Sequence, residues 1–184
     1  NSRALMVTAM GRKYPVTHKS RFNGLANCYL SFLQYAFDTG NGRFRNFMTY
    51  DRHWLEEIGS EDAHGRTLWS LGRAVTYLDN SGQTALATNL FNQAIRAVEH
   101  FRSPRALAFS LIGMSFYLSK FSGDSEVKRV LEILGDRLLR QFEKSARPDW
   151  PWLETSLNYA NGKLPHALLA YGRLTDNSDS IDMA

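Results

Sequence analysis

The chain has 184 residues, of which 43% are hydrophobic and 22% charged, and its formal net charge at pH 7 is +4. This composition excludes an intrinsically disordered protein, and no apolar run reaches the roughly 20 residues that a membrane-spanning helix needs. The single cysteine, Cys28, excludes an internal disulfide and any zinc site built from several thiolates. We therefore expect a globular protein of a reducing, cytoplasmic compartment, without a metal, a cofactor or a membrane partner.

Charge does not point to nucleic acid. The 22 basic and 18 acidic residues are interspersed along the chain. No block of about five like charges occurs, and no zinc-finger spacing or aromatic RNA-binding motif is present. Nucleic acid is therefore not the expected partner, although the net charge permits an anionic ligand.

Hydrophobic periodicity predicts helices along most of the chain. The segment 125–146 carries one apolar stripe opposite a charged face, which is typical of a surface helix. The segment 104–121 is apolar nearly all round, which is typical of a helix buried on most sides. The predicted helices span residues 2–13, 22–38, 61–79, 83–101, 104–121, 125–146 and 163–174.

A weak repeat marks every second predicted helix. Arg or His, followed two positions later by Leu, occurs at Arg3, Arg66, Arg105 and His166, and a glycine follows each within a few turns. Such repeats indicate stacked helical hairpins, with buried odd-numbered helices inside and amphipathic even-numbered ones outside. The sequence therefore predicts an all-α fold, either an α/α toroid or a curved solenoid.

Of these two arrangements we favour a partial (α/α)6-toroid-like array of helical hairpins, with one short strand-like segment in a loop. Helical pattern begins almost at the first residue and a further helix opens at the last, while the predicted helices are too few to close a ring. We therefore expect residues 1–184 to form a single domain that is a fragment of a larger one, truncated at both ends.

Two long connections lead from an outer helix to the next inner one, at residues 39–60 and 147–162, and loops of this length are often functional. Residues 43–50 alternate like a short strand. Trp54, Trp150 and Trp152 lie in these loops beside several carboxylates. This combination suits a sugar, because aromatic rings stack on the apolar face of a pyranose while carboxylates and amides bind its hydroxyls.

The sugar hypothesis gives each candidate a role. Glu61 or Asp62, together with Glu154, would act as acid and base, since two carboxyls that flank a glycosidic bond can divide this work. The aromatic side chains would shape the sugar subsites, and the remaining polar ones would bind hydroxyls or an anionic group. The candidate ligand-binding residues are Tyr50, Asp51, Trp54, His64, Arg66, Asp149, Trp150, Trp152, Tyr159 and Asn161.

Structural roles compete with these assignments. Ser60 or Asp62 can cap the helix predicted at 61–79, and Glu61 suits its positive N-terminus. His64 and Arg66 can be plain helix surface.

The second loop and the helices allow structural interpretations as well. Asp149 can be a turn residue, and Trp150 and Trp152 can wedge their loop onto the core. Trp69 is predicted to be a core residue, and Cys28 is predicted to lie buried on an apolar helix face.

Two motifs resemble the signatures of a known group. The first is RFRNFMTYDRHWLEEIGSEDAHGR at 43–66; the second joins DWPWLE at 149–154 to YAN at 159–161 and LPHALL at 164–169. Together they resemble poorly characterised bacterial proteins labelled glycosyltransferase or glycosyltransferase-associated, which are similar to the six-hairpin glycosidases. The resemblance implies an α/α toroid and a role in carbohydrate metabolism.

Two functions follow as alternatives. In the first, the protein acts on glycosidic bonds of an oligosaccharide through paired carboxylates. In the second, it is a non-catalytic module that binds a glycan or a protein in association with a glycosyltransferase system. Opposed carboxyls about 5–10 Å apart would favour hydrolysis, whereas carboxylates engaged in caps and ion pairs would favour binding.

Overall fold

The computed structural model describes residues 1–11 and 19–184 and has an all-α fold, as predicted. The predicted helix at 2–13 is confirmed over Ser2–Gly11, and residues 12 and 13 lie outside the described residues. A short helical turn of 3-10 type, η1, covers Ile95–His100. The helices are α1 (Ser2–Gly11), α2 (Lys19–Ala36), α3 (Glu61–Tyr77), α4 (Ser81–Ala94), α5 (Pro104–Lys120), α6 (Ser125–Ser145), α7 (Lys163–Thr175) and α8 (Ser178–Met183).

Two predicted helices end earlier than the periodicity suggested, and α2 also begins three residues before the predicted start. The segment predicted at 22–38 leaves the helix after Ala36, and Phe37–Asp38 forms strand β1, which pairs antiparallel with β2 at Arg43–Phe44. The segment predicted at 83–101 changes from α4 into η1 after Ala94. The strand-like stretch at 43–50 is confirmed only in its first residues and in an isolated bridge between Met48 and Trp54.

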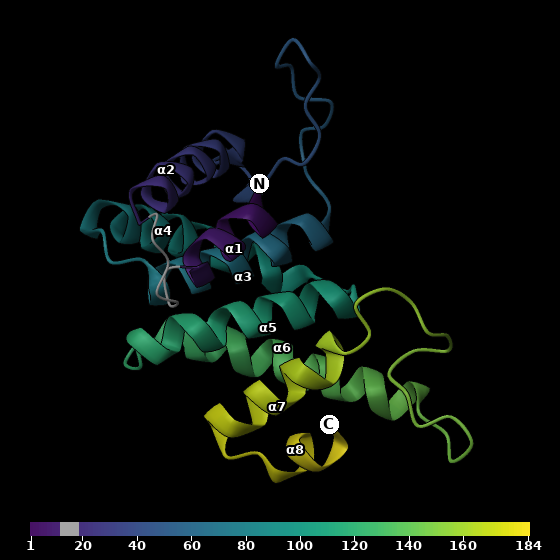
Figure 1. Cartoon of the computed structure of the whole chain (residues 1–184). Helices are drawn as coiled ribbons and strands as arrows, with labels where there is room; N and C mark the ends of the chain where they lie inside the picture. The colour runs from purple at the N-terminus through teal and green to yellow at the C-terminus, as the bar shows by residue number, and fades with distance from the viewer. Residues whose placement is uncertain (12–18) are drawn as a thin grey trace.

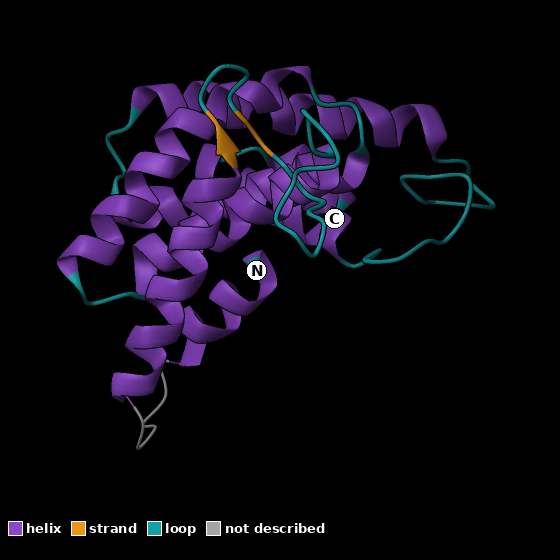
Figure 2. Ribbon diagram, turned by 90° about the horizontal axis from the view of Figure 1, so that it is seen from above, coloured by secondary structure: helices purple, strands orange, loops and turns teal. Residues whose placement is uncertain are grey.

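The helices form two layers. The odd-numbered helices lie side by side in the order α1, α3, α5 and α7, and each packs against the even-numbered helix that follows it (Figure 1). Because each even-numbered helix returns the chain, all the odd-numbered helices begin at the same end of the array. Both long loops lie at this end (Figure 1), and Figure 2 shows the first of them in teal beside the small β-hairpin. The stacked hairpins are thus present, while closure into a ring stays a prediction.

The buried helix α5 lies at the centre of the core. Every residue from Arg105 to Met114 is buried, as the nearly continuous apolar pattern predicted. Two of the repeated glycines explain how closely α3 approaches it. A Cβ atom at Gly72 would lie 2.2 Å from the carbonyl oxygen of Gly113, and one at Gly113 would lie 2.7 Å from that of Leu68. The glycines of the repeat therefore allow the backbones of α3 and α5 to approach closely where the two helices cross.

The prediction for Cys28 is wrong, because this side chain is exposed. The buried face of α2 carries Ala26, Leu30 and Leu33, which recur with the helical period. Cys28 lies on the opposite side of the helix from this face. No helix in the described part of the chain is long and apolar enough to cross a bilayer.

Candidate functional site

The candidate site lies where the odd-numbered helices begin and the two long loops meet them. Ser60 caps α3, and its hydroxyl accepts a hydrogen bond from the amide of Ala63 at 3.1 Å. Glu61, a predicted acid or base, accepts hydrogen bonds from the backbone amides of Arg102 at 2.9 Å and Ser103 at 2.8 Å. The Glu61 carboxylate therefore ties the start of α5 to the start of α3.

Asp62 is held between two partners. One oxygen accepts a hydrogen bond from Nε of Arg66 at 2.7 Å, one turn along α3. The other accepts at 2.6 Å from the hydroxyl of Tyr159, which lies 97 positions further along the chain. Burial and the neighbouring carboxylate of Asp62 raise the pKa of Tyr159, so the phenol stays protonated and donates. Asp62 and Arg66, both predicted site residues, thus lie together with a third predicted residue, Tyr159.

Glu154 forms the most buried ion pair of this region. Its two oxygens accept hydrogen bonds from both terminal nitrogens of Arg105, at 2.7 and 2.6 Å. Arg105 also donates to the backbone carbonyl of Tyr159 and, at 3.2 Å, to the side chain of Asn161. Only 7% of the Arg105 side chain and 18% of the Glu154 side chain are exposed. The hydrogen bonds to Glu154 raise the pKa of Arg105.

These contacts form one polar network, which we call the loop-end network: Asp62, Arg66, Arg105, Glu154, Tyr159 and Asn161. It connects α3 and α5 to the second long loop. All three predicted catalytic carboxylates are therefore engaged, Glu61 with backbone amides and the other two with arginines.

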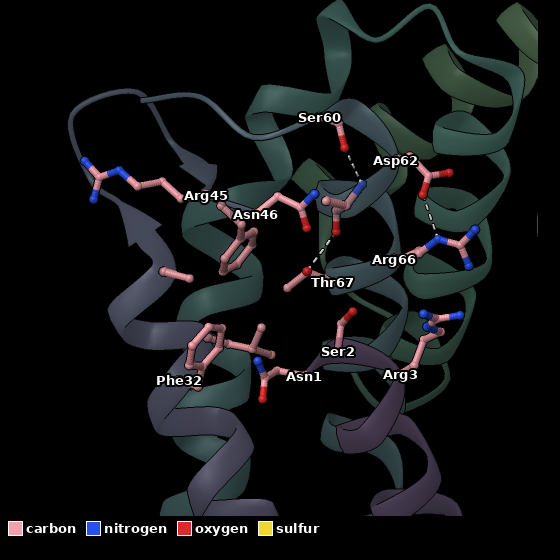
Figure 3. Close-up of a pocket in the computed structure, with 14 residues that line it drawn as sticks. Asn1, Ser2, Arg3, Phe32, Arg45, Asn46, Ser60, Asp62, Arg66 and Thr67 are labelled. Carbon is pink, nitrogen blue, oxygen red and sulfur yellow. Dashed lines mark hydrogen bonds and ion pairs between the residues drawn. The ribbon is translucent and has the colours of Figure 1, made fainter. Parts of the chain in front are cut away.

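A pocket of about 370 Å³ opens next to this network, between α1, α2, α3 and the first long loop. Its walls carry amide, hydroxyl, guanidinium and carboxylate groups, and Phe32 contributes an aromatic ring (Figure 3). Arg45 is paired with Asp38, and Asp62 with Arg66. The lining residues are Asn1, Ser2, Arg3, Phe32, Leu33, Ala36, Phe44, Arg45, Asn46, Ser60, Asp62, Ala63, Arg66 and Thr67.

The first-loop candidates lie outside this pocket. Tyr50 is fully exposed at the loop tip, where Asp51 contacts His53 at 2.9 Å. The hydrogen bonds from Thr49 and His53 lower the pKa of Asp51. Trp54 packs against Tyr35, with 5.4 Å between ring centroids, and therefore supports the loop.

The two tryptophans of the second loop also have structural roles within that loop. The indole of Trp150 donates to the backbone carbonyl of Glu154 at 2.7 Å. Trp152 is half-buried, and Asp149 lies 3.6 Å from Arg147 in an exposed ion pair. None of these three lines the pocket described above.

His64 requires a correction, because the structure buries it completely. Its ring lies between Phe44 and Phe101; Nδ1 accepts from the amide of Phe44 at 3.4 Å and Nε2 contacts the carbonyl oxygen of Ala94 at 3.1 Å. Burial, aided by the charge of Arg43, lowers the pKa of His64 to about 3. The residue is a neutral core histidine and cannot reach a ligand. The burial of His64 follows from its position on α3, because His64 faces the outer layer of helices while Arg66 faces the site.

Other residues of the site were not predicted. Arg105 was noted only as part of the repeat, although it is the partner of Glu154. Phe32, Arg45 and Asn46 line the pocket, and their position depends on how α2 and the first loop pack. Trp69 is buried as predicted and stacks on Phe109, with 5.7 Å between centroids.

Comparisons with protein-family models, with curated proteins and with solved structures find no match to this chain. Among the described residues, no group of three or more potential metal ligands lies together.

Proposed function

We propose that this chain is a carbohydrate-binding array whose ligand occupies the pocket between α1, α2 and α3. The pocket volume, about 370 Å³, is near the lower end of the range for small-molecule sites. Sugar hydroxyls both donate and accept hydrogen bonds, and Asn46, Thr67 and Asp62 offer acceptors and donors of matching kinds. Phe32 adds an apolar surface for a pyranose face.

Binding is favoured over hydrolysis because the candidate carboxylates already have hydrogen-bond and ion-pair partners. Asp62 is the one carboxylate among the described residues that line the pocket, and it already accepts from Arg66 and Tyr159. A carboxyl pair that hydrolyses a glycosidic bond needs a second carboxyl across the gap. Glu154, the other predicted member, is held by Arg105. Recognition of an oligosaccharide is therefore the better-supported role.

The proposal also includes the toroid arrangement of the helices. We infer that the hairpins are arranged as in an (α/α)6 toroid of the six-hairpin glycosidase type and act within a glycosyltransferase-associated system. The ordered layers and the resemblance of the two motifs support this inference.

Binding can be tested by saturation-transfer NMR with a panel of neutral and acidic mono- and oligosaccharides. We expect at least one sugar to bind and Asn46→Ala to weaken it about tenfold, as loss of one good hydrogen bond would. The matched control is Asn89→Ala, an exposed position of α4 outside the pocket. Absence of binding across the panel, or equal loss in both variants, would contradict the proposal.

The catalytic alternative has its own measurement. The intact protein is screened for hydrolysis of the sugars that bind, and any turnover is measured again in Asp62→Asn and Glu154→Gln. Turnover that depends on both carboxylates would replace binding by catalysis as the function. Turnover unchanged in Glu154→Gln would remove that residue from any mechanism.

A further inference from the structure

A second group of charged side chains lies on the face that α3, α5 and α7 share. Along α3, Arg66, Trp69 and Arg73 recur with the helical period and face Phe109 and Phe116 of α5. The Arg66 guanidinium lies 4.2 Å from the Phe109 ring centroid, and that of Arg73 lies 4.5 Å from the Phe116 centroid. Cations and aromatic rings therefore form a ladder along this face.

Helix α7 adds two basic residues to the ladder. Nζ of Lys163 lies 4.7 Å from the centroid of the Trp69 ring, and the Arg73 guanidinium lies 5.5 Å from the same centroid. His166 follows one turn further along α7. Burial lowers the pKa values of Lys163 and His166, and the charge of Arg73 lowers both further. The three basic groups thus lie close enough to repel one another.

Nothing in the described chain neutralises this group. The acidic residues of the face, Asp62 and Glu154, are paired with Arg66 and Arg105 at the loop end. Within residues 1–11 and 19–184, no carboxylate forms an ion pair with Arg73, Lys163 or His166. Nε of Arg73 is also buried without a hydrogen-bond partner. Arg73 and Lys163 both lie over the Trp69 ring, and an anion bound between them would offset the repulsion between their positive charges.

We propose that Arg73, Lys163 and His166 form an anion-binding site for a phosphate monoester. A phosphate carries up to two negative charges, which match the two permanent cations, and protonation of His166 can add a third positive group. Lysine supplies a point charge and arginine a donor fork, which is the usual combination for phosphate. The Trp69 ring gives the group an apolar wall. None of the three basic residues lines the sugar pocket, so this site stands independently of the proposed function.

The test uses inorganic phosphate and glucose 6-phosphate at constant ionic strength, with binding followed by NMR of the Trp69 indole N–H and the His166 ring. We expect saturable shifts for both probes, and affinity reduced about tenfold in Arg73→Gln and in Lys163→Gln. Lys128→Gln, an exposed lysine of α6, is the matched control and should bind as the parent does. Circular dichroism and the melting temperature check that each variant is folded.

Three results would overturn the proposal. Chloride producing the same shifts would show screening rather than a site. Affinity that is unchanged in folded Lys163→Gln would remove the central cation from the site. Glucuronate binding more tightly than glucose 6-phosphate would show that the group selects a carboxylate instead of a phosphate.

Discussion

Both long loops lead from an outer helix to the N-terminus of an inner one, and both combine tryptophans with carboxylates, yet they are held in different ways. The first loop, residues 39–60, is closed largely by contacts within itself. The carboxylate of Glu56 accepts from the amides of Asn46 and Phe47, and Arg43 donates to the carbonyl of Gly59 at 2.6 Å. Gly59 lies so close to Phe44 that a Cβ atom would meet its carbonyl oxygen at 2.1 Å.

The second loop, residues 147–162, is held by the helices beneath it. Glu154 binds Arg105 of α5, and the hydroxyl of Tyr159 donates to Asp62 of α3. Similar composition therefore does not indicate similar roles. Glu56 in the first loop shapes its own loop, whereas Glu154 in the second connects its loop to the site.

Removal of the Arg105 side chain should have the largest effect. Arg105→Gln leaves the carboxylate of Glu154 largely buried without its partner, so we expect the free energy of unfolding to fall by about 3 kcal/mol. Urea denaturation measures the change. Arg129→Gln, which breaks ion pairs with Glu99 and Glu126 on the surface, is the control and should cost much less. Equal losses in the two variants would mean that the second loop is not anchored through Arg105.

The core beneath the first loop should respond to acid through His64. Its pKa is about 3 in the folded protein and near 6.5 when unfolded, so the unfolded state binds one more proton between these values. Stability is therefore lost as pH falls, by about 1.5 kcal/mol from pH 6.5 to pH 5. Urea denaturation across this range, in the parent and in His64→Gln, isolates the effect. The same slope in both proteins would exclude His64 as its source.

Glu56→Gln should weaken the first loop locally. The variant loses a charge-assisted acceptor for two backbone amides, which we expect to cost about 1 kcal/mol and to speed hydrogen exchange at Phe47. Glu57→Gln changes the neighbouring exposed carboxylate and is the matched control. If exchange in the second loop changed as well, the two loops would be coupled rather than separately held.

The smallest effect is expected at the tip of the first loop. Tyr50 is fully exposed, so Tyr50→Ser should alter the free energy of unfolding by less than about 0.5 kcal/mol. Sugar binding should also be unchanged, because Tyr50 lies outside the pocket. A clear loss of sugar affinity in this variant would return Tyr50 to the site and weaken the distinction between the loops.

Several of the candidate residues lie together for a simple reason. Asp62, Arg66, Tyr159, Asn161 and Glu154 lie in one network because the odd-numbered helices all begin at one end, as the alternating pattern indicated. Composition could not say which side chains face the pocket. Tryptophans are as useful for supporting a loop as for stacking on a sugar.

The all-α fold, the alternation of buried and amphipathic helices and the position of the long loops all follow from the sequence, because these features depend on local periodicity. Partner choice was decided by the tertiary structure. Glu154 meets Arg105 across 49 positions, and His64 is buried while Arg66, two residues later, is not. Burial and pairing of this kind depend on how the helices cross and which side chains meet in the protein interior. A local pattern in the sequence does not contain this information.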